Sequence, residues 1–150
     1  MARFNEVRKI TKAQQEMYVA VNAMRTDLKE TALKHFKKSF DDEGFTEKAF
    51  WHWTPLKRER KGRFRGQKIL TNTGKLKNSI KTRVNSNRNG FNVTFFSNVK
   101  YAAIHNEGLY GKAFGKYPFK MPKRMFMGYS TVLDRKLQSI FDKKIQRIFK

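Results

Sequence analysis

The sequence predicts an α+β fold in which a small antiparallel β-sheet is packed by a long N-terminal helix and a C-terminal helix, with long mobile loops. Apolar residues recur at helical spacing near both ends of the chain, and two short segments in the middle alternate polar with apolar residues. A length of 150 residues is that of one domain. We divide this domain, residues 1–150, into an N-terminal helix (1–44), an aromatic and basic linker (45–68), a β-rich core (69–128) and a C-terminal helix (129–150).

Composition limits the classes of function. There is no cysteine, which excludes disulfides, a thiolate nucleophile and Cys-type zinc sites. Lys and Arg exceed Asp and Glu by 22, which favours contact with nucleic acid or an acidic protein, although a solvated basic surface is the alternative. The start of the chain lacks the apolar segment of a signal peptide, and no run is long and apolar enough to span a membrane, so we expect no membrane association.

The first segment, residues 5–42, predicts one long amphipathic helix. Its apolar residues are three or four positions apart and therefore share one face, which we assign to the core: Met17, Val21, Met24, Leu28, Ala32, Phe36 and Phe40. Gly44 is the expected residue just after the helix. A helix of this length could extend past the domain and pack on a neighbour.

The linker combines aromatic residues with a basic run. Trp51 and Trp53 precede Pro55, and this cluster is expected to cover the core. The run that follows mixes cations with glycine and Phe64, so it could hold single-stranded nucleic acid by stacking and phosphate contacts, or be a surface loop that orders on assembly. Its candidate assembly or DNA contacts are Lys57, Arg58, Arg60, Lys61, Arg63, Arg65 and Lys68.

The β-rich core begins with a turn and a hairpin. Thr73 is the expected N-cap of a short helical turn that buries Leu76. Residues 80–84 and 91–95 each alternate polar with apolar residues, and the Asn89-Gly90 pair between them is typical of a hairpin turn.

The rest of the core is expected to be less regular. Residues 101–105 predict a short helix, and glycines with Pro118 predict a loop over residues 109–120. Residues 122–127 could form a final strand, and Tyr101, Ile104 and Phe126 are expected in the core. Residues 130–149 again show helical spacing.

No arrangement of residues typical of catalysis is present. His105 and Glu107 are two positions apart, which is wrong for one helix face, and no serine lies in a Gly-x-Ser-x-Gly motif. The glycines at 108, 111 and 115 lack the Gly-Lys-Ser/Thr ending of a phosphate loop. We therefore expect no enzyme, no cofactor and no metal site.

The order of motifs resembles small neck and tail-completion proteins of tailed bacteriophages, the virion morphogenesis family. After the Trp and Pro cluster come Thr-Gly-x-Leu-x-x-Ser, Tyr-Ala-x-Ile-His-x-x-Gly and Pro-x-Arg-x-Phe, the last of which has Met125 where the family usually has proline. The motif residues, expected to be mainly structural, are Thr73, Gly74, Leu76, Ser79, Tyr101, Ala102, His105, Gly108, Pro122, Arg124 and Phe126.

The resemblance implies a non-enzymatic virion protein that joins or completes the tail at the head–tail interface. Members look like α+β domains that assemble as rings, here expected to be a hexamer or dodecamer. Implied partners are other neck, tail and portal-connector proteins, with possible non-specific contact with genomic DNA. The implied location is the virion neck, and the host bacterial cytoplasm during assembly. The alternative is a non-enzymatic nucleic-acid-binding protein that uses the basic loop 57–68.

Overall fold

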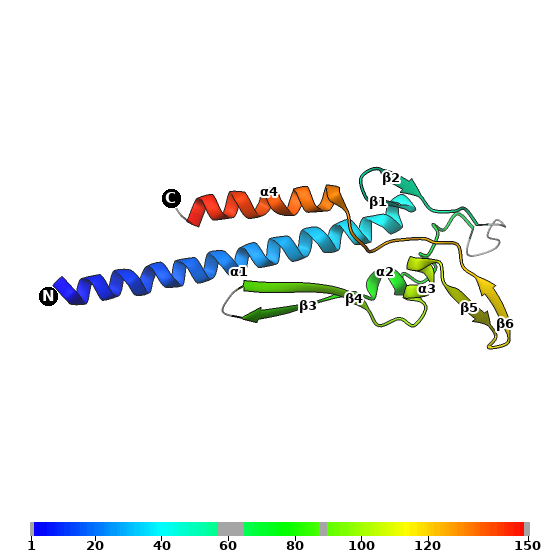
Figure 1. Ribbon diagram of the computed structural model, residues 1–150, viewed down its shortest axis with the longest axis horizontal. Helices are drawn as coiled ribbons and strands as arrows, with labels where there is room; N and C mark the ends of the chain where they lie inside the picture. The colour runs from blue at the N-terminus through cyan, green and yellow to red at the C-terminus, as the bar shows by residue number, and fades with distance from the viewer. Residues whose placement is uncertain (1, 57–64, 88–89, 149–150) are drawn as a thin grey trace.

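In the part of the chain that the structure describes, two long helices, two short helices and three β-hairpins form an elongated molecule (Figure 1). The computed structural model describes residues 2–56, 65–87 and 90–148, and the side chains of residues 11–56, 65–87, 90–112 and 114–148. In chain order the elements are α1 (Ala2–Asp42), β1 (Gly44–Thr46), β2 (Phe50–His52), α2 (Lys75–Asn78), β3 (Ile80–Asn87), β4 (Gly90–Ser97), α3 (Ala102–Glu107), β5 (Tyr110–Ala113), β6 (Tyr117–Lys120) and α4 (Thr131–Ile148). This confirms the predicted α+β class with a long N-terminal and a C-terminal helix.

The strands pair as three separate antiparallel hairpins, β1–β2, β3–β4 and β5–β6. The predicted central hairpin is confirmed, with Ile80 opposite Ser97, Val84 opposite Val93 and Asn87 opposite Gly90. Its alternating pattern leaves Val84 and Val93 partly buried on the face toward α1, while their neighbours are exposed. The predicted turn residue Asn89 lies outside the described residues.

The core gathers around the C-terminal half of α1. Phe40, Phe45 and Phe126 are its largest fully buried side chains. The Phe40 ring lies 5.5 Å from Trp53 and 5.0 Å from Phe126, measured between ring centroids. Such tilted and edge-to-face pairs are the arrangement that aromatic rings prefer. Ala32, Phe36, Ile69, Leu76, Ile80, Ala102 and Leu133 complete the buried cluster.

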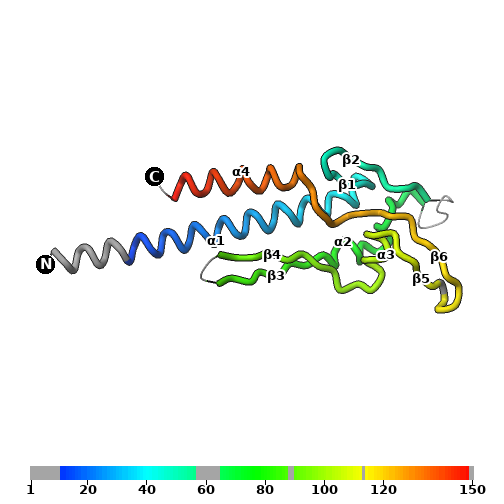
Figure 2. The backbone as a smooth tube through the Cα atoms, in the orientation of Figure 1, coloured from blue at the N-terminus to red at the C-terminus, as the bar shows by residue number. Residues whose placement is uncertain are grey.

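The blue part of α1, which follows residue 10, projects beyond this core (Figure 2). A helix of 41 residues is about 61 Å long at 1.5 Å per residue, whereas the 18-residue α4 covers only about 27 Å of it. Met24 is buried, as predicted, but the assignment of Met17 to the core is wrong, because 49% of its surface is exposed.

The exit from α1 differs from the prediction. The residue with a left-handed backbone is Glu43, with φ 52°, and not Gly44, which already begins β1. Gly44 is required for another reason, because a Cβ there would lie 2.4 Å from Cζ of Phe50 and 2.5 Å from the carbonyl oxygen of Trp51. The β1–β2 hairpin that needs this close approach was not predicted.

Four further expectations are corrected. The predicted loop at residues 109–120 is the β5–β6 hairpin, and residues 122–127 form no strand. Gly74, with φ 68°, is the N-cap of α2 in place of Thr73, although the Thr73 hydroxyl still accepts a bond from the Lys75 N–H. Tyr101 is exposed, because it lies just before α3 with its ring beside His105 on the surface side.

The C-terminal helix was predicted to within a residue or two of its observed bounds. Ser130 is its N-cap, since its hydroxyl oxygen accepts a hydrogen bond from the Leu133 N–H at 3.1 Å. The hydroxyls of Ser130 and Thr131 in turn donate to the Glu47 carbonyl, at 3.2 Å and 3.1 Å. The start of α4 is thereby fixed to the β1–β2 turn.

Candidate assembly surfaces and the junction that supports them

A buried asparagine joins α3 to the segment before α4. The Asn106 side-chain oxygen accepts hydrogen bonds from the N–H groups of Phe126 at 2.9 Å and Met127 at 3.0 Å. Its amide nitrogen donates to the Met127 carbonyl at 2.9 Å. The side chain thus satisfies three backbone groups, as a paired strand would. Sequence reasoning missed this residue, because nothing in the local pattern indicates bonds to residues 20 positions away.

The same segment is tied to the aromatic linker. Trp53 donates its indole N–H to the Met125 carbonyl at 2.7 Å. The buried guanidinium of Arg124 donates from Nε and Nη2 to the Thr54 carbonyl, at 3.1 Å and 2.9 Å. The Arg124 backbone N–H donates to the His105 carbonyl at 2.8 Å. Arg124 is therefore directed inward, away from any partner that approaches the surface.

Gly108 allows α3 to end in close contact with the segment before α4. Its φ of 70° is left-handed, and a Cβ there would lie 3.0 Å from the backbone of Lys123. Ser79 serves the neighbouring junction, since its hydroxyl hydrogen-bonds both the Leu76 carbonyl and the Ser97 hydroxyl at 2.7 Å. The structure thus brings Ser79, His105, Gly108, Arg124 and Phe126 into the packing between elements.

Of the basic residues predicted to contact DNA or a partner protein, the structure describes only Arg65 and Lys68. Lys57, Arg58, Arg60, Lys61 and Arg63 lie outside the described residues. Arg65 is exposed. Lys68 donates its ammonium to the Asp41 carbonyl at the end of α1, where the helix dipole favours a cation.

Two histidines are partly buried. Burial, followed by the charge of Lys136, lowers the pKa of His35, and Nε2 of this ring has no hydrogen-bond partner among the described residues. Burial, followed by the charge of Arg124, lowers the pKa of His105, whose Nδ1 likewise has no partner in that part of the chain. Within the part of the chain that the structure describes, no three metal-ligating side chains gather at one place.

Large apolar side chains are exposed at several places among the described residues, including Trp51 on β2, which is 65% exposed although its cluster was expected to cover the core. Two other places each expose several such side chains. On α1, Tyr18 and Val19 are 69% and 65% exposed, next to Met17. On the β5–β6 hairpin, Tyr110 and Tyr117 are 73% and 67% exposed, and Phe114 at the turn is 94% exposed. Side chains of this size are frequent at protein and nucleic-acid interfaces, so both places are candidate contact surfaces.

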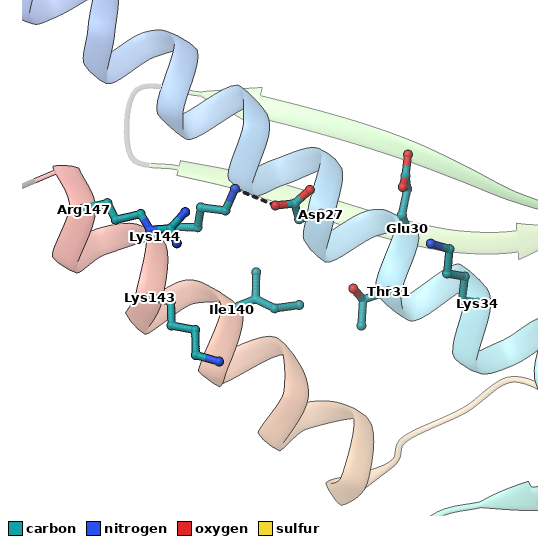
Figure 3. A pocket seen from close by; sticks show the side chains of 8 residues that line it. All are labelled: Asp27, Glu30, Thr31, Lys34, Ile140, Lys143, Lys144 and Arg147. Carbon is teal, nitrogen blue, oxygen red and sulfur yellow. Dashed lines mark ion pairs between the residues drawn. The ribbon is translucent and has the colours of Figure 1, made fainter.

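A groove between α1 and α4 adjoins the first of these surfaces. One part, about 310 Å³, is lined by charged residues of both helices, and Asp27 pairs there with Lys144 at 2.7 Å (Figure 3). A second part, about 510 Å³, is lined on the α1 side by Glu16 and by the small or apolar residues Ala13, Met17, Ala20 and Ala23, and on the α4 side by Lys144, Arg147 and Ile148. This second part adjoins the segment of α1 that projects beyond the core.

Charge is unevenly distributed along the chain. Residues 60–133 contain sixteen Lys and Arg but a single carboxylate, Glu107. The other eleven acidic residues lie in the remaining segments, where several pair with lysine, as Asp42 does with Lys38 and Asp41 with Lys77 at 2.5 Å. The β-rich part therefore has a strongly positive field, and the helical part a mixed one.

Comparison with known proteins identifies the family. The model of the phage virion morphogenesis family matches residues 4–146, which is nearly the whole chain. The chain belongs to this family. Neither the comparison with curated proteins nor that with solved structures finds a match.

Membership in the phage virion morphogenesis family supports a structural or assembly role in the virion and interaction with other virion proteins. It also suggests a non-enzymatic protein. Among the described residues, no helix is long and apolar enough to cross a membrane.

Proposed function

We propose that this protein is a structural component of the phage neck, which completes the tail at the head–tail interface as a homo-oligomeric ring of six or twelve subunits. Its partners are the neighbouring neck, tail and portal-connector proteins, and it performs no catalysis. It is present in the host cytoplasm during assembly and in the virion afterwards. Family membership supports the virion role, and the exposed part of α1 supports the oligomer.

One observation supports the ring in particular. Residues 17–24 of α1, Met-Tyr-Val-Ala-Val-Asn-Ala-Met, are apolar on nearly every side of the helix. A helix that is apolar all round is normally buried, yet Tyr18 and Val19 are mostly exposed in the single chain. A second copy of the chain, present in every ring, is the partner that we assign to this surface.

The test introduces charged residues on this surface of α1 in the full-length chain. A variant with Tyr18→Asp and Val19→Asp is compared with Gln14→Asp and Gln15→Asp, which adds the same charge one turn earlier at exposed positions. We expect the first variant to remain helical by circular dichroism but to sediment as a monomer and to be missing from tailed particles. The second variant should behave as the parent.

Two results would reject the proposal. Equal oligomerisation of the two variants would show that the α1 surface is not the ring contact. Absence of immunogold label from intact and gently disrupted particles would exclude the virion role itself. Label away from the head–tail junction would exclude the neck position.

A second candidate function is nucleic-acid binding by the basic loop 57–68. The excess of cations over residues 60–133 favours it. The test measures DNA affinity at several salt concentrations for a variant in which four residues of the loop are replaced by alanine: Arg60, Lys61, Arg63 and Arg65. Affinity and salt dependence equal to those of the parent would reject the loop as the DNA contact.

A further inference from the structure

The β5–β6 hairpin is a two-stranded ribbon that extends from the body of the molecule at the end opposite to the N-terminus of α1 (Figure 1). Tyr110 is paired with Lys120, and Gly111 with Phe119. The Phe119 ring lies across Gly111, where an added Cβ would be 2.7 Å from Cζ of that ring. Isolated two-stranded hairpins are marginally stable in water, so a hairpin uncovered on both sides is expected to gain order from a ligand.

The turn of this hairpin is strained. Phe114 has φ 51° and Gly115 has φ 72°. Glycine adopts this left-handed conformation readily, but a bulky residue such as Phe does so rarely and at a cost in free energy. The same Phe114 side chain is 94% exposed, so packing within the described chain does not offset that cost. Strain combined with exposure of a large aromatic ring is typical of contact residues.

The charge on the hairpin indicates the class of ligand. Lys112, Lys116 and Lys120 are all exposed, and they lie among the aromatic residues of the hairpin. No carboxylate lies between Gly108 and Leu133. Lysine, unlike tyrosine and phenylalanine, is depleted at protein–protein interfaces, whereas cations beside aromatic rings occur together in nucleic-acid contacts. A polyanion therefore complements this surface better than another protein does.

We propose that the β5–β6 hairpin binds double-stranded DNA without sequence preference. Lys112, Lys116 and Lys120 contact phosphates, and Phe114 enters the groove between them. A two-stranded β-ribbon has the width that the major groove of B-DNA admits. These residues are distinct from the basic loop 57–68, and their contact with DNA does not depend on the position of the protein in the virion.

The first experiment measures binding of the full-length protein to a 30-base-pair duplex from 50 to 200 mM salt. The triple variant Lys112→Gln, Lys116→Gln, Lys120→Gln is compared with Lys29→Gln, Lys34→Gln, Lys143→Gln, which removes the same charge from the helices. Each lost phosphate contact lowers the slope of log affinity against log salt by about 0.9. Over this fourfold range of salt, the affinity of the parent should therefore fall about 40-fold more than that of the hairpin variant.

The control triple variant should retain the parental slope. Phe114→Ala should weaken binding without changing the slope, because it removes an apolar contact and no phosphate contact. The substituted side chains are exposed, except Lys29, which is partly exposed, and none belongs to the buried core. An unchanged circular dichroism spectrum verifies folding for every variant.

Three results would overturn the proposal. One is an equal change of slope in both triple variants, which would indicate only the effect of overall charge. Another is loss of slope in the variant of the loop 57–68 but not in the hairpin variant. The third is tighter binding of a single strand than of the duplex, which would exclude the groove geometry. None of these bears on incorporation into particles, so failure here is separate from failure of the proposed neck role.

Discussion

Asn106 provides the sharpest test of how the junction between α3 and α4 is held. The substitution Asn106→Ala removes the partner of two N–H groups, those of Phe126 and Met127, and of one carbonyl, that of Met127. The Phe126 N–H is buried, whereas the groups of Met127 are only partly so. A buried donor left without a partner costs about 1 to 3 kcal/mol, and partly exposed groups recover some of this from water.

The expected loss of unfolding free energy for Asn106→Ala is therefore about 3 kcal/mol, since one full penalty and two partial ones are incurred. In a domain of this size that loss lowers the melting temperature by about 6 to 12 °C. Urea unfolding followed by the fluorescence of Trp51 and Trp53 measures the loss. Asn106→Asp should not restore the parental stability, because its carboxylate still accepts from both N–H groups but places a charged oxygen against the Met127 carbonyl and the Glu107 carboxylate, to which the amide nitrogen donates.

The matched control for the junction is Asn92→Ala on β4, an exposed position where less than about 0.5 kcal/mol should be lost. A loss for Asn106→Ala no larger than that of the control would refute the reasoning. It would mean that water replaces the amide and that the segment before α4 is held by packing of Phe126 instead.

Two further outcomes concern pH and backbone geometry. Burial lowers the pKa of His35 and His105 in the folded chain, so the unfolded chain takes up protons first as the pH falls through about 6.5. The contribution of these histidines to stability is therefore full above that pH and decreases as the pH falls from there toward the folded-state pKa values. The urea midpoint should therefore be lower at pH 5.5 than at pH 7.5, and replacing both histidines with glutamine should reduce the difference. Gly108→Ala should cost about 1 to 3 kcal/mol by urea unfolding, because φ is positive and the added Cβ meets the backbone of Lys123, whereas Gly66→Ala, also at positive φ but in open space, should cost less.

The sequence predicts those elements whose pattern repeats over many residues. The helical spacing of α1 continues from Met24 to Phe40, and the alternation of β3 and β4 is supported by Asn89-Gly90, so both elements could be recognised from local residues alone. The hairpin β1–β2 has three residues per strand, which is too short for a period to be recognised. Its position depends on Gly44 approaching Trp51, a contact that only the folded chain shows.

The β5–β6 hairpin was missed for a different reason. Its glycines and Pro118 are typical of loops, and that composition outweighed the strand-forming residues Tyr110, Tyr117 and Phe119. The sequence did contain a hairpin signal, since Gly115 lies between two short segments that include aromatic residues. The exposure of Phe114 could not have been predicted, because apolar residues are ordinarily assigned to the core.

The two candidate surfaces lie at opposite ends of the molecule, so a combined variant tests whether they act separately (Figure 1). Tyr18→Asp with Val19→Asp alters the α1 surface, and the three lysine substitutions alter the β5–β6 hairpin. Substitutions that share no partner usually add within about 0.5 kcal/mol. The effect of the lysine substitutions on the DNA affinity per subunit should therefore be the same with and without the α1 substitutions. If the α1 variant alone also shows a much smaller slope of log affinity against log salt than the parent, the DNA contact requires several subunits together, and the ring itself is the DNA-binding unit.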